Sequence, residues 1–349
     1  MLKSLKIKNF TLFSNNDLEF VPGLNVIMGD NATGKSHLLK LLYTISSTLD
    51  KSTEKKEFAR VLTDKLNKVF RQDIKHLRST NAGQDKTDIE LNFTLDKTQF
   101  MTLQFSYTYN TQKYVKLEKI PSKLFDISTL FIPAHEVLSL HPWLISLYEK
   151  KEISLSELYY DLCLKLLSPS LKKLDEPLAS IKTDLETLIG GQVRTDERGL
   201  FIMSEKKGEL RPGLIADGPS KLAGLIQLID NGSLHQNSIV FWDEVDAHLN
   251  PKALVEIAKV LMILVQYGLQ IFISTHSFFL MKELSNLTLY EDKYSDSSIQ
   301  FFNLSFDGQL EIGDKLTDLH NIQSLEEILT QDDREQFWFY QQAIKQNGK

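Results

Sequence analysis

The sequence predicts an α/β protein with a mainly parallel core sheet, an antiparallel side sheet and an inserted, mostly helical lobe. Three apolar runs, at residues 24–28, 239–242 and 270–275, are typical of short buried strands. Helical patterns follow the first two runs, and this alternation favours a parallel sheet flanked by helices. With 349 residues, the chain is long enough for one large α/β domain with an insert, or for two or three domains.

A complete phosphate-binding loop, Gly-Asp-Asn-Ala-Thr-Gly-Lys-Ser, occupies residues 29–36. The strand before it and the helix after it, which we expect to reach about residue 49, form an anion cradle, because loop N–H groups and the helix dipole face phosphate oxygens. A chance match in an ordinary loop would not need these flanks. Lys35 is predicted to reach the β- and γ-phosphates, and the Ser36 hydroxyl to bind Mg²⁺. The predicted nucleotide contacts are Gly29, Asn31, Ala32, Thr33, Gly34, Lys35, Ser36 and His37.

Residues 1–142 are predicted to form the N-terminal lobe around this loop. Its other elements are expected to be strands at 5–8 and 17–20, a helical stretch at 51–79, strands at 89–95, 102–109 and 113–119, and a buried strand at 130–133. The three strands between residues 89 and 119 alternate apolar and polar side chains, as antiparallel strands with one solvated face do. They therefore predict the side sheet.

Residues 143–215 are predicted to be the inserted lobe, because the pattern is helical from 143 to about 188 and then gives a hairpin. Residues 216–349 are predicted to be the C-terminal lobe. Its expected elements are helices at 221–229, 252–267 and 324–345 and strands at 239–242, 270–275 and 299–306.

Two carboxylates, Asp243 and Glu244, end the apolar run at 239–242. The strand would place them at its carboxyl edge, where open α/β sheets bind ligands. We expect Asp243 to hold hydrated Mg²⁺ and Glu244 to polarise the attacking water as a general base. The alternative is a turn-forming acidic pair after a strand.

The stretch Asp243-Glu-Val-Asp-Ala-His-Leu-Asn-Pro251 resembles the Walker B motif and D-loop of ATP-binding-cassette ATPases. The strand that ends in Thr275-His276-Ser277 resembles their switch-histidine loop. The resemblance implies that Asp246 is the D-loop acid, and that His276 contacts the γ-phosphate and the attacking water.

A Leu-x-x-Leu-x-Ile-x-Asn-Phe opening, an early phosphate loop and a long insert resemble the SMC-type branch, which includes the RecF and OLD ATPases. About 180 residues separate Ser36 from Asp217 without sustained heptads, so a compact head is expected. The family's signature segment is matched best by residues 215–222. The resemblance implies that Gly218, Ser220 and Lys221 face the nucleotide of a second subunit. The alternative is that this segment is an ordinary helix cap.

The resemblance implies an ATPase with ATP and Mg²⁺ as cofactors, working as a homodimer that sandwiches ATP, or as a larger oligomer. Only about 70 residues follow His276, too few for the nuclease domain of full OLD proteins. We therefore expect a separate effector such as a nuclease, in anti-phage defence or genome maintenance. The alternative is a RecF-like repair ATPase that binds DNA directly. A transporter subunit and a non-hydrolysing scaffold fit the motifs less well.

The net charge of −6 and the pI of about 5.8 argue against a dedicated nucleic-acid binder, although local contact stays possible. Basic clusters at 51–56, 65–78 and 113–119 are interleaved with acidic or apolar residues, which is typical of solvent-exposed faces of helices or strands. The alternative is a surface that contacts the phosphate backbone of DNA or RNA. The single cysteine, Cys163, is expected to be a buried packing thiol. With no apolar run long enough to span a membrane and no signal peptide, the chain is expected to be cytoplasmic.

Some aromatic and polar residues have two readings. Phe10 and Phe13 would either stack on adenine or pack in the core. His135 or Glu136 stands near the position of the glutamine loop of transporter ATPases, and either would touch Mg²⁺ or its waters.

The C-terminal helix carries four consecutive aromatic residues around Trp338. We expect them to dock this helix on the body, the alternative being a partner surface.

Overall fold

The structure is a computed structural model that describes all residues except 52–53, 80–85, 95–98, 112, 124–126, 136–137, 139–140, 197–198, 307 and 348–349. For residues 141–142, 217 and 340–347 it describes the backbone alone. Glu136, one of the two residues expected to contact Mg²⁺ or its waters, therefore lies outside the described residues.

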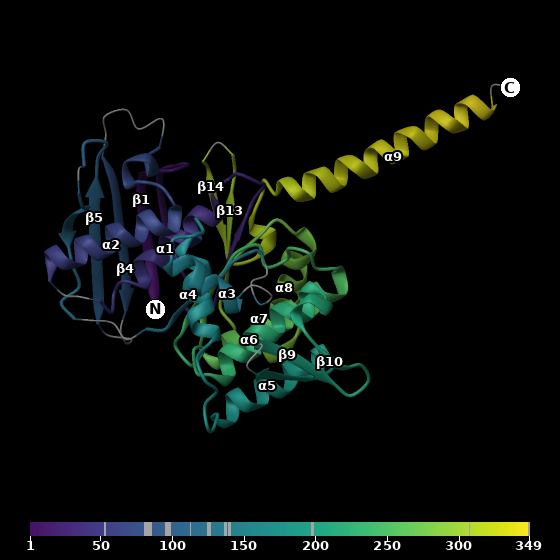
Figure 1. Cartoon of the computed structure of the whole chain (residues 1–349). Helices are drawn as coiled ribbons and strands as arrows, with labels where there is room; N and C mark the ends of the chain where they lie inside the picture. The colour runs from purple at the N-terminus through teal and green to yellow at the C-terminus, as the bar shows by residue number, and fades with distance from the viewer. Residues whose placement is uncertain are drawn as a thin grey trace.

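A six-stranded sheet forms the centre of the molecule, as the sequence predicts (Figure 1). Its order is β14 (Leu310–Gly313), β13 (Ile299–Leu304), β3 (Leu24–Met28), β12 (Gln270–Thr275), β11 (Ile239–Trp242) and β7 (Thr129–Ile132). Neighbouring strands are parallel except at the edge, where β14 is antiparallel to β13. The three strands predicted at 24–28, 239–242 and 270–275 have the predicted bounds and lie side by side.

The antiparallel side sheet is also present and is larger than predicted. Its order is β2 (Phe13–Glu19), β1 (Leu2–Phe10), β4 (Thr87–Thr94), β5 (Phe100–Tyr107) and β6 (Lys116–Lys119). The strands predicted at 5–8 and 17–20 were expected only to precede the phosphate loop, and they are part of β1 and β2. Their alternating burial shows why they belong here: Leu5 and Ile7 are buried while Lys6 and Lys8 are exposed.

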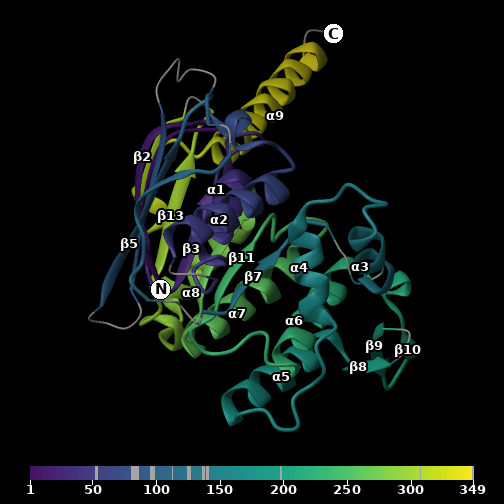
Figure 2. The same cartoon turned by 60° about the vertical axis from the view of Figure 1, so that its left-hand side comes forward.

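Helices fill the space between the two sheets and cover the outer face of the central sheet (Figure 2). Helix α1 (Lys35–Ser46) and helix α2 (Lys55–Phe70) share one apolar core with the side sheet and one face of the central sheet. Helices α6 (Asp217–Asp230), α7 (Pro251–Tyr267) and α8 (Phe278–Tyr290) share the other core. Successive residues alternate between them: Phe241 enters the first core and Trp242 the second.

Residues between β7 and α6 form α3 (His141–Glu149), α4 (Glu157–Leu166), α5 (Glu176–Ile189) and a small sheet. The small sheet is β10 (Gly208–Leu210), β9 (Gly199–Ser204) and β8 (Gln192–Asp196). Strands β10 and β14 and helix α8 were not predicted. Buried Cys163 on α4 confirms the packing thiol. Whether residues 143–215 behave as a separate lobe stays a prediction.

Helix α9 (Gln323–Asn347) corrects one expectation, because it projects away from the body instead of docking on it (Figure 1). Phe337, Trp338 and Phe339 are 60–69% exposed. Among the described side chains of this helix, Leu325, near its base, packs against the core. Successive side chains of an α-helix point about 100° apart around its axis, so three consecutive aromatic residues cannot all face one surface. None of the described helices is long and apolar enough to cross a lipid bilayer.

Two predicted roles for aromatic residues near the loop are also decided by burial. Phe10 and Phe13 are almost fully buried, and Phe10 meets Phe70 edge-on at 5.6 Å between ring centroids. Both rings are therefore part of the core, which is the packing reading of the sequence.

Candidate nucleotide site

Three predicted motifs meet at the carboxyl edge of the central sheet. Strand β12 lies between β3 and β11, with Met28 opposite Thr275 and Trp242 opposite Ile273. The segments that leave these strands are the loop at 29–36, the acidic pair after Trp242 and the histidine after Thr275. Parallel strands end at the same edge, so residues far apart in sequence become neighbours here.

The loop backbone adopts conformations that favour glycine at its two ends. Gly29 has φ +142° and Gly34 has φ +102°. A Cβ at Gly29 would lie 2.2 Å from the carbonyl oxygen of Leu304, so a larger residue cannot fit. Gly34 is the N-cap residue of α1, and this leaves the first N–H groups of the helix free of side-chain caps. The loop therefore presents an uncapped helix N-terminus, as an anion site requires.

The Lys35 side chain folds back over its own loop. Its ammonium donates hydrogen bonds to the carbonyl oxygens of Gly29 at 2.8 Å and Asp30 at 2.6 Å. Burial lowers the pKa of Lys35, and the negative charges of Glu244 and Asp243 partly oppose that effect. The cation is thus held inside the cradle by neutral carbonyl groups that a phosphate would outcompete.

Ser36 links the loop to the acidic pair. Its hydroxyl donates a hydrogen bond of 2.8 Å to Oδ1 of Asp243. Hydroxyl and carboxylate oxygens are the ligands that Mg²⁺ prefers, and the metal usually takes one or two of them from protein while keeping several waters. The two side chains predicted to bind Mg²⁺ therefore fit that ion. The described residues contain no cluster of three or more His, Cys, Asp or Glu side chains around a metal position.

Ser274, on β12, is a site residue that the sequence reasoning missed. Its hydroxyl donates to Oδ1 of Asp243 at 2.6 Å and accepts from the backbone N–H of Glu244 at 2.7 Å. Glu244 has φ +44°, a conformation uncommon for a residue with a side chain. Ser274 is fully buried. A polar residue in an otherwise apolar strand needs a hydrogen-bond partner, and this was the sequence signal that could have indicated its role.

The predicted switch and D-loop residues face each other. Nδ1 of His276 lies 3.4 Å from Oδ2 of Asp246. The histidine is about half exposed, while the carboxylate is almost fully buried. The other carboxylate oxygen of Asp246 has no hydrogen-bond partner among the described residues. A buried acceptor without a donor costs free energy, which a new donor would recover.

The predicted signature residues lie against the D-loop of their own chain. The Lys221 ammonium donates to the carbonyl oxygen of Ala247 at 2.9 Å, and Gly218 packs beside Leu249. Ser220 is buried, and its hydroxyl has no partner among the described residues. The trans role of these residues stays a prediction, and the backbone at the start of α6 would have to carry it.

The remaining predicted contacts surround the cradle. Thr33 donates to the carbonyl oxygen of Asp30 at 2.9 Å, while Asn31 and Ala32 are exposed at the loop tip. His37 meets Phe70 edge-on, and burial, followed by the charge of Lys40, lowers its pKa.

Tyr159, on α4, is a second residue that the sequence reasoning missed. Burial, followed by the negative charge of Asp243, raises the pKa of the Tyr159 phenol. His135, which the sequence put near Mg²⁺, lines a small cavity with Ser220 and Lys221, and its contact with the metal stays a prediction.

Comparison with known proteins identifies relatives of both the sequence and the fold. A family model described as the RecF/RecN/SMC N-terminal domain matches residues 1–295. A DNA replication and repair protein RecF from Lachnoclostridium phytofermentans is 30% identical over 90 residues, 25% of each chain. An ATP/GTP phosphatase from Helicobacter pylori is 31% identical over 124 residues, 35% of this chain and 32% of that protein. The matches thus span about a quarter to a third of these relatives.

Two solved structures of SMC heads have the same fold. A head bound to the C-winged helix domain of ScpA superposes with a TM-score of 0.55 at 13% identity, over 89% of this chain and 96% of that one. A Pyrococcus furiosus Smc head bound to the C-terminal domain of ScpA gives 0.53 at 14% identity, over 89% and 95%. At these identities the likeness is one of fold.

Proposed function

Because this chain belongs to the RecF/RecN/SMC N-terminal domain family, we propose that it binds ATP with Mg²⁺ and hydrolyses it to ADP and phosphate. The observation that carries this proposal is the hydrogen-bonded series Ser36–Asp243–Ser274–Glu244, which ties the phosphate loop to the acidic pair through one buried hydroxyl. An acidic pair that served only as a turn would not need this link to the loop.

Each residue of the cradle has its own role in the proposed hydrolysis. Lys35 exchanges the carbonyl oxygens of Gly29 and Asp30 for oxygens of the β- and γ-phosphates. Ser36 and Asp243 hold the metal, which when bound neutralises phosphate charge. Glu244 accepts a proton from the attacking water, and His276 lies across the same edge to contact the γ-phosphate. The water oxygen bonds to the γ-phosphorus while the bond from that phosphorus to the bridging oxygen breaks, so that ADP leaves with the bridging oxygen and inorganic phosphate is released.

A homodimer that sandwiches ATP, or a larger oligomer built from it, would complete the site. The carboxylate of Asp246 supports this arrangement, because its buried Oδ1 has no hydrogen-bond donor among the described residues and would gain one if the D-loop moved on dimerisation. The start of α6, next to the D-loop, is the surface that would face the second nucleotide. ATP would then act by binding the closed dimer more tightly than the open one.

We further propose that the ATP cycle controls a separate effector protein, such as a nuclease, in anti-phage defence or genome maintenance. The exposed aromatic residues of α9 support a protein partner, since contiguous exposed apolar side chains mark interaction sites. A RecF-like repair ATPase that binds DNA directly is the second candidate. The named relative RecF from Lachnoclostridium phytofermentans favours it.

The test is Glu244→Gln in the full chain. Phosphate release from ATP should fall by a factor of about 100 or more, since a general base typically contributes 10²–10⁴. The variant should accumulate as an ATP-bound dimer by size-exclusion chromatography with light scattering. Glu291→Gln, exposed at the end of α8, is the matched control. Unchanged hydrolysis and unchanged mass in Glu244→Gln would rule out the assigned base.

A DNA-binding titration distinguishes the two biological roles. ATP-dependent binding to double-stranded DNA that weakens with salt would favour the repair ATPase. Its absence, together with ATP-dependent dimerisation, would favour control of a separate effector.

A further inference from the structure

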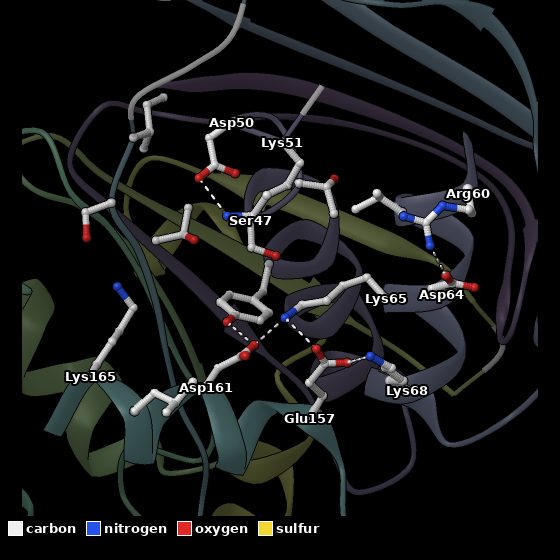
Figure 3. A pocket seen from close by; sticks show the side chains of 17 residues that line it. Ser47, Asp50, Lys51, Arg60, Asp64, Lys65, Lys68, Glu157, Asp161 and Lys165 are labelled. Carbon is white, nitrogen blue, oxygen red and sulfur yellow. Dashed lines mark hydrogen bonds and ion pairs between the residues drawn. The ribbon is translucent and has the colours of Figure 1, made fainter. Parts of the chain in front are cut away.

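A second cavity, of about 660 Å³, opens at the end of α1 opposite the nucleotide site (Figure 3). Helix α1 starts at Lys35 in the phosphate loop and ends near Ser47 in this cavity. At 1.5 Å per residue its twelve residues span about 18 Å, so the two sites are separate. Helices α2 and α4 and the start of β7 form the other walls. Small-molecule sites commonly have volumes of about 300–1,000 Å³.

One wall of the cavity is a fixed network of charges. Asp161 on α4 accepts hydrogen bonds from the Tyr43 hydroxyl at 2.6 Å and from the Lys65 ammonium. Glu157 accepts from Lys65 at 3.5 Å and lies 3.6 Å from the Lys68 ammonium. Two lysines and two carboxylates therefore neutralise each other here. This part of the basic cluster at 65–78 is committed to ion pairs within the chain.

The other charged groups are also paired, with one exception. Lys51 lies 2.9 Å from Asp50, and Arg60 lies 3.2 Å from Asp64. Among the described lining residues, Lys165 is the one cation whose side chain makes no hydrogen bond or ion pair. Figure 3 shows its ammonium reaching from α4 toward the cavity with no partner drawn to it. The lining thus carries one unmatched positive charge.

The surroundings of Lys165 make that charge costly. Burial lowers its pKa, the carboxylates of Asp161 and Asp50 partly oppose this, and the neighbouring Lys51 ammonium lowers it further. A half-buried ammonium without a partner gains more from an incoming anion than an exposed one does. Lys51 lines the same cavity, so a ligand group with more than one negative charge would have a second ammonium to meet there. A phosphate monoester carries about −1.5 to −2 at pH 7.

The cavity is too large for an inorganic anion alone. Val61, Ile127 and Leu164 add apolar wall, and the more exposed carboxylates of Asp50 and Asp64 offer acceptors for hydroxyl or amino groups. We propose that this cavity binds a small phosphorylated organic molecule, of sugar-phosphate to mononucleotide size, with its phosphate on Lys165. This inference goes beyond the proposed ATPase and does not depend on it.

The test is isothermal titration of the full chain with ribose 5-phosphate while saturating Mg-ADP occupies the phosphate loop. One further equivalent should bind, and Lys165→Met should weaken it at least about tenfold, as expected for a lost charge-assisted contact. Lys51→Met should weaken it less. Lys172→Met, an exposed lysine away from the cavity, is the matched control. Urea unfolding of each variant shows whether it is folded.

Repeating the titration in Lys35→Met without ADP separates this proposal from the ATPase. Ribose 5-phosphate binding should persist there even if nucleotide binding is lost. No further equivalent, or equal affinity in Lys165→Met, would overturn the site. Equal affinity for inorganic phosphate and ribose 5-phosphate would overturn the organic ligand. Displacement of the sugar phosphate by a DNA duplex at Lys165 would replace the proposal with a nucleic-acid contact.

Discussion

The Ser274 hydroxyl lies 2.6 Å from the Asp243 carboxylate, although 31 positions separate the two residues in sequence. Because the same oxygen accepts the N–H of Glu244, it fixes both members of the acidic pair. The carboxylate that would bind the metal and the one that would activate water therefore share a single support. Strand β12 would thus contribute to the proposed hydrolysis through Ser274 as well as through His276, which follows the strand.

Ser274→Ala should lower ATP hydrolysis by roughly 10- to 100-fold and raise the Mg²⁺ concentration needed for half-maximal rate. The reason is that Asp243 loses a donor and the Glu244 N–H is left without its acceptor. The free energy of unfolding should fall by about 1–3 kcal/mol, the usual cost of a buried unsatisfied group. Phosphate release across a Mg²⁺ series and urea unfolding measure the two effects. Ser285→Ala, a buried serine on α8, controls for loss of any buried hydroxyl.

Asp246→Asn should lower the rate of ATP hydrolysis, because it removes the charge that faces His276. The carboxylate holds Nδ1 of His276 at 3.4 Å, and an amide would remove the charge without changing the shape. We expect a three- to tenfold lower rate, close to that of His276→Gln, and little further loss in the double variant, because residues acting as one unit are not additive. Steady-state phosphate release decides this. Fully multiplicative effects of the two changes would contradict the pairing.

The motifs predicted the centre of the site because each depends on local chemistry. The strand 24–28, the loop 29–36 and the pair Asp243–Glu244 are contiguous, and parallel strands bring their ends together. Ser274 could not be predicted this way, because its role exists only across two strands. Tyr159 was missed for the same reason: Asp243, whose charge raises the pKa of its phenol, is 84 positions away in sequence.

The predictions failed for segments whose apolar pattern is compatible with more than one structure. Helix α8 has apolar residues on most sides, so its sequence lacks a clear helical stripe. For α9 the aromatic run near Trp338 predicted docking, but composition cannot show whether a surface exists to receive it. Burial in the core, by contrast, followed from the pattern at Cys163.

His37 should make the nucleotide-free protein less stable as pH falls. Burial lowers its pKa in the folded state below the unfolded value of about 6.5. Between those two values the unfolded chain binds more protons, so the free energy of unfolding decreases with acidification and recovers above about pH 6.5. His37→Gln should flatten this slope in urea titrations from pH 7 to 5.5. An unchanged slope would show that another group titrates.

The aromatic residues of α9 should contribute to association and not to folding. Trp338→Ser and Phe339→Ser remove side chains that are 61% and 69% exposed, so the free energy of unfolding should change by less than about 0.5 kcal/mol. The same variants should bind less of a hydrophobic dye and self-associate less at high concentration. Leu325→Ser, at the base of the helix where the side chain packs against the core, should instead cost about 1–2 kcal/mol. Urea unfolding and light scattering separate the two classes, and a large loss of stability in Trp338→Ser would mean that α9 docks in solution.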